Sequence, residues 1–222
     1  MEISVIVPII KEKYINELIK RIHKTLNGIK HEIIVVELVP EGEEPTKIKD
    51  AIYVRQKSRG LGRAVLEGLE YANGKYVVVM DGDGSHRPED IPKMLKAMRK
   101  YDIVIGSRFV EGGVTNDYTH RKFISFLYRN FANIVLGLGI KDSMSGFSCT
   151  KKEIYEKIKL DPIGFKINME LVYKAKKMGY KIGEVPIIFE KRKCGVTTTR
   201  TFNRGEIFKI IRFIFELKLG IR

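Results

Sequence analysis

Two aspartates separated by one glycine stand directly after an apolar run and have the spacing of metal ligands. Residues 76–80, YVVVM, predict a buried strand, and Asp81 and Asp83 follow in a segment that must leave the sheet at its carboxyl end. Open α/β sheets bind ligands at that edge. Because carboxylate oxygens at this spacing suit Mg²⁺ or Mn²⁺, we expect the ion to be shared with a substrate diphosphate.

The same residues could instead close a hairpin through an Asp-Gly turn. Residues 88–90, Pro-Glu-Asp, open a helical pattern that runs to residue 100, and no second strand follows directly. We therefore prefer the ligand-binding interpretation, in which Gly82 and Gly84 allow the backbone to approach a ligand closely.

Strand and helix patterns alternate in the residues that would position this loop, which predicts a largely parallel, twisted sheet. Strands are expected at residues 3–7, 33–36, 52–54, 77–80 and 103–105, and helices at 15–26, 64–71 and 88–100. Further helices are expected at 121–136, 151–157 and 168–178, with a strand at 181–190. Pro186 favours a position of that last strand near the sheet edge. No linker divides the chain, so residues 1–203 are interpreted as one domain.

Composition is that of a soluble globular protein with an excess of positive charge. The chain has 222 residues, 44% hydrophobic and 31% charged, with a formal charge of +14. Such a charge favours phosphates, nucleic acid or a lipid surface as partners. No secretory leader opens the sequence, so a cytoplasmic location is expected. Cys149 and Cys194 indicate neither a disulfide nor a zinc site, and abundant Lys and Glu indicate a heat-adapted source.

The last segment, residues 204–222, predicts an amphipathic helix with a wide Ile/Phe face. Between residues 191 and 222 nine Lys/Arg stand against two Glu, so half of the positive excess lies here. The charges interrupt the apolar run too often for a bilayer-spanning helix. Two interpretations stay open: a helix that packs on the sheet, or a helix that lies on a membrane surface.

Residues 59–68, RGLGRAVLEG, only partly match a dinucleotide-binding motif. GxGxxG would need a glycine or alanine at Val65. We interpret the segment as a turn that brings backbone N–H groups and Arg59 toward a nucleotide. Tight packing of a helix is the alternative explanation of its glycines.

Seven segments in a fixed order resemble the family 2 glycosyltransferases of the GT-A fold. They are SVIVP (4–8), RGLGRAVLEGLEYANGKY (59–76), MDGDGSHRPEDI (80–91), GSRFVEGG (106–113), DSMSGF (142–147), GFKINMEL (164–171) and GEVPIIF (183–189). Within that family the chain is most similar to the polyprenyl-phosphate hexosyltransferases of the dolichol-phosphate mannose synthase type. The resemblance implies an α/β, Rossmann-like domain at residues 1–203, with a mostly parallel sheet flanked by helices.

The resemblance also implies a donor and metal side of the site. Asp81 and Asp83 match the metal-binding DxD pair, and Ser85 stands where the lipid-phosphate enzymes often have a Gln ligand. The remaining donor-side positions are Pro8, Ile10, Glu12, Val36, Glu37, Arg59 and Gly82. Ile10 and Lys11 replace the usual Tyr and Asn, and Leu38 replaces the second Asp of the segment that binds base and ribose.

An acceptor side follows from the same likeness. Arg108 matches a phosphate-binding arginine, and Arg121 and Arg192 match arginines near the acceptor. Lys166 and Glu170 match a lysine and an acidic position of these enzymes. For each arginine, a solvated surface charge or an ion pair is the alternative interpretation.

The chemistry of such a transfer explains why arginines would matter more than histidines. An acceptor phosphate is already ionised near neutral pH, so its attack on the anomeric carbon needs no general base, but it is repelled by the donor phosphates. Arginine answers that repulsion with a permanently charged fork. A metal ion would stabilise the charge that develops on the leaving nucleotide.

The sequence thus predicts a metal-dependent, inverting enzyme. It would move a hexose, mannose from GDP-mannose, to dolichyl or polyprenyl phosphate at the cytoplasmic face of a membrane in an archaeal-type cell, alone or with a membrane partner protein. One alternative is a family 2 transferase that acts on a soluble or protein hydroxyl, with Glu170 as base. Another is a non-catalytic basic module that binds polyanions.

Overall fold

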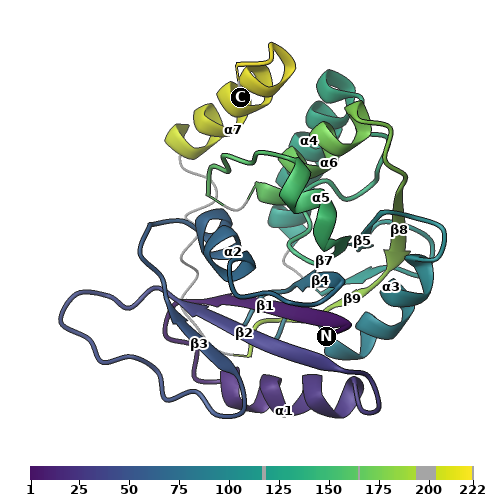
Figure 1. Ribbon diagram of the computed structural model, residues 1–222. Helices are drawn as coiled ribbons and strands as arrows, with labels where there is room; N and C mark the ends of the chain where they lie inside the picture. Colours follow the sequence, from purple (N-terminus) through teal and green to yellow (C-terminus); the bar gives the residue numbers. More distant parts are fainter. Residues whose placement is uncertain (117–118, 165, 194–203, 222) are drawn as a thin grey trace.

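A seven-stranded sheet forms the centre of the protein, in the order β3-β2-β1-β4-β7-β5-β8 (Figure 1). The computed structural model describes residues 1–116, 119–164, 166–193 and 204–221, without the side chains of 119–126, 204, 206 and 207. The strands are β1 (Ile3–Ile9), β2 (His31–Glu37), β3 (Ile52–Arg55), β4 (Tyr76–Val79), β5 (Ile103–Ser107), β7 (Ser148–Lys151) and β8 (Ile182–Pro186). All neighbours are parallel except β7, which runs antiparallel to both β4 and β5.

Helices cover both faces of this sheet, so the fold has three layers. One face carries α1 (Ile15–Thr25), the 3₁₀ turn η1 (Pro88–Asp90) and α3 (Ile91–Ala97); the other carries α2 (Leu61–Leu69), α4 (Thr119–Leu136), α5 (Lys152–Lys157) and α6 (Ile167–Lys177). The two-residue strands β6 (Val114–Thr115) and β9 (Ile188–Phe189) pair separately, in parallel. A last helix, α7 (Arg204–Lys218), packs against α4.

The alternation of side chains along each strand explains the two cores. On β1, Val5 and Val7 are fully buried against the α1 and α3 layer, while Ile6 is fully buried on the opposite side with α2. Because apolar residues occupy both faces, the central strands read as continuous hydrophobic runs, as is typical of parallel sheets.

Most elements lie where the sequence predicts them. The predicted position of the strand with Pro186 near the edge of the sheet is also confirmed. β8, which ends at Pro186, is the last strand of the sheet. Two details differ. The helix expected at 64–71 begins earlier, at Leu61, and ends at Leu69, and the strand expected at 181–190 is divided into β8 and β9. The central strand β7 was not anticipated, because the four residues SCTK show neither an apolar run nor alternation.

The C-terminal helix divides its apolar residues between the core and the surface. Ile210, Phe213, Ile214 and Leu217 are at most 1% exposed and join the core on the α4 side of the sheet. Phe208 is 68% exposed on the other side of the helix. Packing on the core therefore accounts for one face of α7. Among the described residues, no helix is both long and apolar enough to cross a bilayer.

Replacing Phe213 by Ala should destabilise the protein, since the side chain is fully buried between α7 and the core. We expect the free energy of unfolding to fall by about 3–5 kcal/mol, measured by urea denaturation. Phe208→Ala, in the same helix, is the matched control and should change it by less than about 0.5 kcal/mol. Equal small effects of the two substitutions would contradict the packing of α7 on the core.

Candidate functional site

The loop that follows β4 turns sharply, and its own groups fix the carboxylate of Asp83. One oxygen of Asp83, Oδ1, accepts hydrogen bonds from the backbone N–H and the hydroxyl of Ser85, at 2.9 and 2.5 Å. Gly84 has φ +80°, and a Cβ there would lie 2.9 Å from the ring of Tyr14. Gly82 is equally constrained, because a Cβ would lie 2.4 Å from Ile9 of β1. Both glycines are needed for close packing of the loop.

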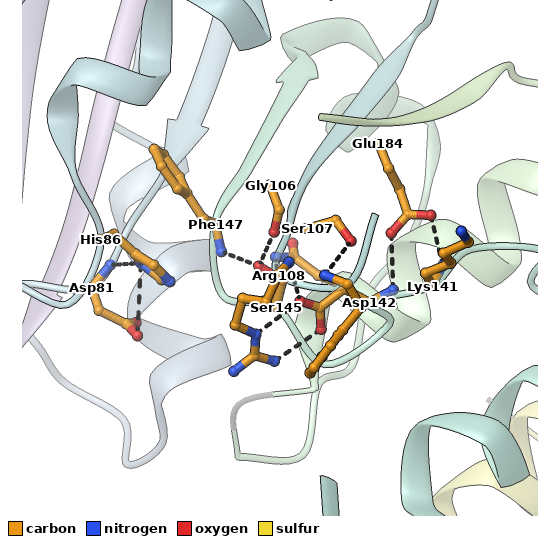
Figure 2. Close-up of polar contacts among 12 residues, drawn as sticks. Asp81, His86, Gly106, Ser107, Arg108, Lys141, Asp142, Ser145, Phe147 and Glu184 are labelled. Carbon is orange, nitrogen blue, oxygen red and sulfur yellow. Dashed lines mark hydrogen bonds and ion pairs between the residues drawn. The ribbon is translucent and has the colours of Figure 1, made fainter. Parts of the chain in front are cut away.

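A buried histidine and an adjacent glycine hold Asp81 from behind. The backbone N–H of Asp81 donates to Nδ1 of His86 at 3.0 Å, and His86 stacks on Phe147 with ring centroids 5.0 Å apart (Figure 2). Burial lowers the pKa of His86, so a neutral ring with an unprotonated Nδ1 fits this contact. A Cβ at Gly146 would lie only 3.2 Å from Oδ1 of Asp81. His86 therefore supports Asp81 and does not face outward as a surface residue.

Glu12 brings a third carboxylate into the field of the two aspartates. Burial and the neighbouring charge of Asp83 raise the pKa of Glu12 to about 7, although Arg192 acts in the opposite direction. Burial also raises the pKa of Asp81, and the charge of Asp83 adds to the increase. Oε2 of Glu12 is buried without a hydrogen-bond partner. Negative charge is thus concentrated here beyond what its neighbours neutralise.

The segment after β9 lies along the Asp83 loop and supplies a cation to it. Nε of Arg192 is 2.9 Å from Oδ2 of Asp83. The backbone N–H groups of Glu190 and Lys193 donate to the carbonyls of Ser85 and Asp83, at 2.9 and 3.0 Å. Lys193 also contacts the ring and hydroxyl of Tyr14. Arg192, predicted from the sequence, therefore lies beside the aspartate pair.

Arg108 follows β5 and is held by a buried aspartate. Its Nε and Nη2 donate to Oδ2 and Oδ1 of Asp142, at 2.8 and 2.9 Å (Figure 2). Burial raises the pKa of Asp81, and the charges of Arg192 and Arg108 act in the opposite direction. Two arginines thus act on the electrostatics of the aspartate pair.

The chemistry of this donor set fits a divalent ion that is completed by a ligand. Within the described residues no group of three His, Cys, Asp or Glu side chains has the arrangement of a complete metal site. Asp81 and Asp83 offer hard oxygens, and Mg²⁺ is commonly held by one or two carboxylates plus substrate phosphates. The raised pKa values of Glu12 and Asp81 indicate the same need for an added cation. Ser85 donates its hydroxyl hydrogen to Asp83, so its expected role as a ligand stays a prediction.

Other predicted donor-side residues serve the fold as well. The carboxylate of Glu37 accepts hydrogen bonds from Thr46 and from the hydroxyl of Tyr53, whose pKa burial and Glu37 raise to about 12. Val36 is fully buried in the core, and Pro8 is buried within β1. Ile10 is 38% exposed next to Glu12, and Arg59 is exposed at the start of α2.

The RGLG segment packs tightly against a neighbouring loop. A Cβ at Gly62 would lie 2.6 Å from Pro162, and the N–H of Gly62 donates to the carbonyl of Gly164 at 2.7 Å. Tight packing therefore explains Gly62, as the alternative interpretation of this motif predicts.

The residues predicted for the acceptor side are less closely grouped than those around Asp83. Lys166 is 2% exposed at the start of α6, and Glu170 is fully buried and paired with Lys174 at 2.7 Å. Arg121 belongs to α4, but its side chain lies outside the described residues.

Sequence reasoning did not single out two acidic residues that organise the site, Asp142 and Glu184. Both lie inside segments that carry the family resemblance, DSMSGF and GEVPIIF, which is the signal that could have found them. Their role depends on contacts between segments far apart in the chain, which no local pattern reveals.

Comparisons with known proteins agree on one family. The sequence profile of the family described as "Glycosyl transferase family 2" matches residues 4–159. A dolichol-phosphate mannosyltransferase of Pyrococcus furiosus is 38% identical over 98% of this chain, and the chain spans 64% of that relative's length. A polyprenol monophosphomannose synthase of Mycolicibacterium smegmatis is 31% identical, over 87% of this chain and 79% of the relative. An undecaprenyl-phosphate mannosyltransferase of Micrococcus luteus is 38% identical, over 64% of this chain and 61% of the relative.

Solved structures share the fold at low sequence identity. Glucosyl-3-phosphoglycerate synthase of Mycobacterium tuberculosis, in complex with Mn²⁺, UDP and glucosyl-3-phosphoglycerate, superposes with a TM-score of 0.70 at 17% identity. The match covers 99% of this chain and 79% of that one. A structure of the same protein with Mg²⁺ and UDP gives a TM-score of 0.68. This likeness confirms the expected GT-A fold.

Replacing Asp83 by Asn should weaken binding of Mn²⁺ to the protein, because one of the two predicted oxygen ligands would lose its charge. We expect the affinity for Mn²⁺ to fall by at least roughly 10–100-fold, which is the loss that removal of a supporting residue causes at metal sites. Free Mn²⁺ is measured by electron paramagnetic resonance. Asp102→Asn is the matched control, because Asp102 pairs with Lys151 at the opposite end of β5. Equal Mn²⁺ affinity of both variants would argue against a metal at the aspartate pair.

Proposed function

The chain belongs to glycosyl transferase family 2, and on that premise we propose that it transfers mannose from GDP-mannose to a dolichyl or polyprenyl phosphate. The names of the relatives support both the sugar and the acceptor class. The proposal depends on one observation. Arg192, a type of residue that binds phosphate, directly contacts Asp83 of the aspartate pair.

Asp81 and Asp83 are the residues proposed to hold Mg²⁺ or Mn²⁺. When bound, the ion supplies positive charge for the diphosphate that leaves with the nucleotide. Ser85 fixes the carboxylate of Asp83, and His86 holds the backbone of Asp81, before any ligand binds. Because these groups are already in position, little free energy is needed to rearrange them when charge develops in the transition state.

The acceptor phosphate needs positive charge more than it needs a base. It is ionised near neutral pH and can attack the anomeric carbon directly, which inverts the configuration. Arg192 is one-third exposed and can present its guanidinium to a phosphate oxygen, while Arg108 lies deeper beside Asp142. The two arginines offset the repulsion between acceptor and donor phosphates.

A hydroxyl acceptor is the weaker alternative. It requires a general base within hydrogen-bond reach of the proton that is removed. Glu170, the candidate, is fully buried and accepts hydrogen bonds from Lys174 and from the backbone of Asp161. The polyanion-binding alternative explains the charge of +14 but gives no reason for the preorganised aspartate loop.

Transfer of labelled mannose from GDP-mannose to a long-chain polyprenyl phosphate in detergent tests this function. The product should be a lipid-linked mannose that forms with Mg²⁺ or Mn²⁺ and disappears with EDTA. UDP-glucose and a soluble hydroxyl acceptor serve as comparison substrates. Transfer to the hydroxyl acceptor alone would refute the assignment to lipid phosphates.

Arg192→Ala should impair use of the acceptor more than binding of the donor. Removing the guanidinium takes away a phosphate contact, so we expect the KM for the acceptor to rise or kcat to fall by roughly tenfold or more. Donor affinity, measured by calorimetry with GDP and Mn²⁺, should change little. Lys157→Ala removes an exposed ion pair with Glu153 in α5 and is the control. If donor affinity falls as steeply as acceptor use, Arg192 belongs to the nucleotide side.

The exposed apolar residues of α4 and α7 support a peripheral position on the membrane. Ile134 of α4 is 82% and Phe208 of α7 is 68% exposed, and Leu219 and Ile221, which follow α7, are 70% and 68% exposed. The two helices lie side by side at one end of the molecule (Figure 1). Lys209 and Arg212 add positive charge on exposed positions of α7. Such a surface gains from burial in the headgroup boundary and from anionic lipids.

The variant Ile134→Ser/Phe208→Ser should lower binding to anionic liposomes without destabilising the protein, since both side chains are exposed. We expect slower transfer to a long-chain acceptor and unchanged transfer to a short, water-soluble prenyl phosphate. Ile52→Ser/Tyr71→Ser replaces exposed apolar residues outside α4 and α7 and is the control. Equal liposome binding of both variants would rule out this surface as the membrane contact.

A further inference from the structure

We propose that Asp142 is a positioning residue for the reaction, which holds the guanidinium of Arg108 for phosphate, and that Glu184 fixes Asp142 in turn. This inference rests on the proposed function and extends it to two acidic residues that carry no role in it so far.

Asp142 pairs with one edge of the Arg108 guanidinium, the edge formed by Nε and Nη2. Asp142 is fully buried, and its Oδ2 accepts hydrogen bonds from both the backbone N–H and Nε of Arg108, at 3.0 and 2.8 Å. Oδ1 accepts a bond from Nη2 at 2.9 Å. Three bonds from one carboxylate fix the backbone and the side chain of Arg108 together.

The planes of two aromatic rings restrict the guanidinium further. Its Cζ lies 5.2 Å from the ring centroid of Phe109 and 5.1 Å from that of Phe189. The side chain of Arg108 is 13% exposed. The pair with Asp142 engages the Nε and Nη2 edge of the guanidinium, so Nη1 plays no part in it. An arginine held this way has lost most of its rotamer freedom before a ligand arrives.

Glu184 connects the loop of Asp142 to the sheet. Its Oε1 accepts the N–H of Asp142 at 2.9 Å, and its Oε2 accepts the N–H of Lys141 at 2.6 Å (Figure 2). Glu184 lies on β8, directly opposite Ile105 of β5, and β5 leads into Arg108. Glu184, which binds this loop, and Arg108, which the loop binds through Asp142, are therefore anchored by neighbouring strands.

The same loop continues to the aspartate pair. The hydroxyl of Ser145 donates to the carbonyl of Gly106 at 2.6 Å, and the N–H of Gly106 donates to the carbonyl of Phe147 at 2.9 Å. Phe147 stacks on His86, which binds the backbone of Asp81. One segment, residues 141–147, thus sets the position of Arg108 relative to Asp81, which is what a phosphate bridging the two sides would need.

A purely structural ion pair is the competing explanation, and a double-mutant cycle separates the two. Arg108→Ala should lower kcat by roughly 10²–10³-fold, the usual cost of removing a charge-stabilising donor. Asp142→Asn should lower kcat by about 10–100-fold, since a misplaced contact is costly. In the Arg108→Ala background, Asp142→Asn should cost almost nothing more. Independent, multiplicative losses would overturn the proposal.

Two further measurements keep the test decisive. Binding of inorganic pyrophosphate, followed by calorimetry without turnover, should weaken in Asp142→Asn as it does in Arg108→Ala, so this readout does not depend on the identity of the acceptor. Should Asp142→Asn not fold, Glu184→Gln, which keeps one acceptor oxygen, should still lower kcat several-fold with an unchanged Tm. Full activity and full pyrophosphate binding in a folded variant would refute the positioning role, whereas a wild-type protein inactive on lipid phosphate would refute the proposed function alone.

Discussion

Negative charge confined at the end of β4 is the constraint on which the rest of the site depends. Burial raises the pKa values of Glu12 and Asp81, and the neighbouring charge of Asp83 adds to both increases. Such a cluster is stable only if neighbouring groups hold the carboxylates in position and cations compensate them. Most contacts around the loop either hold a carboxylate in position or bring a positive charge close to it.

The compensating arginines differ in how firmly they are held. Arg108 has a buried partner of its own, Asp142, and its guanidinium lies over the rings of Phe109 and Phe189. Arg192 lies on an exposed segment and is paired with Asp83, a carboxylate that is also a candidate metal ligand. A cation at Asp83 would compete with Arg192 for the same oxygen. The site therefore combines one arginine with a buried partner and one that lies on an exposed segment.

The antiparallel strand β7 makes this arrangement possible. Because β7 lies between β4 and β5, the segment that leads into it, residues 141–147, passes between the ends of both strands. Gly146 and Phe147 then lie behind Asp81, and Asp142 lies beside Arg108. A wholly parallel sheet would have brought a strand's carboxyl end, and not this incoming loop, to that position.

The sequence by itself determined the alternation of strands and helices, the aspartate pair at a strand's carboxyl end and the family. Each of these depends on residues close together in the chain: apolar periodicity, turn residues and short motifs. From the sequence, the terminal helix could equally be a core helix or a surface helix. The structure assigns Phe213 to the core and Phe208 to the surface, because the outcome depends on which face meets α4.

Tertiary structure alone decided how the site is supported. Glu37, Glu170 and Glu12 have the same side chain, yet Thr46 and Tyr53 engage the first and Lys174 the second, while Glu12 lies near the carboxylates of Asp81 and Asp83. The pairing of Asp142 with Arg108, 34 residues away, likewise follows from strand order. A carboxylate's role depends on the charges and donors that surround it, and those neighbours come from distant segments that only the folded chain brings together.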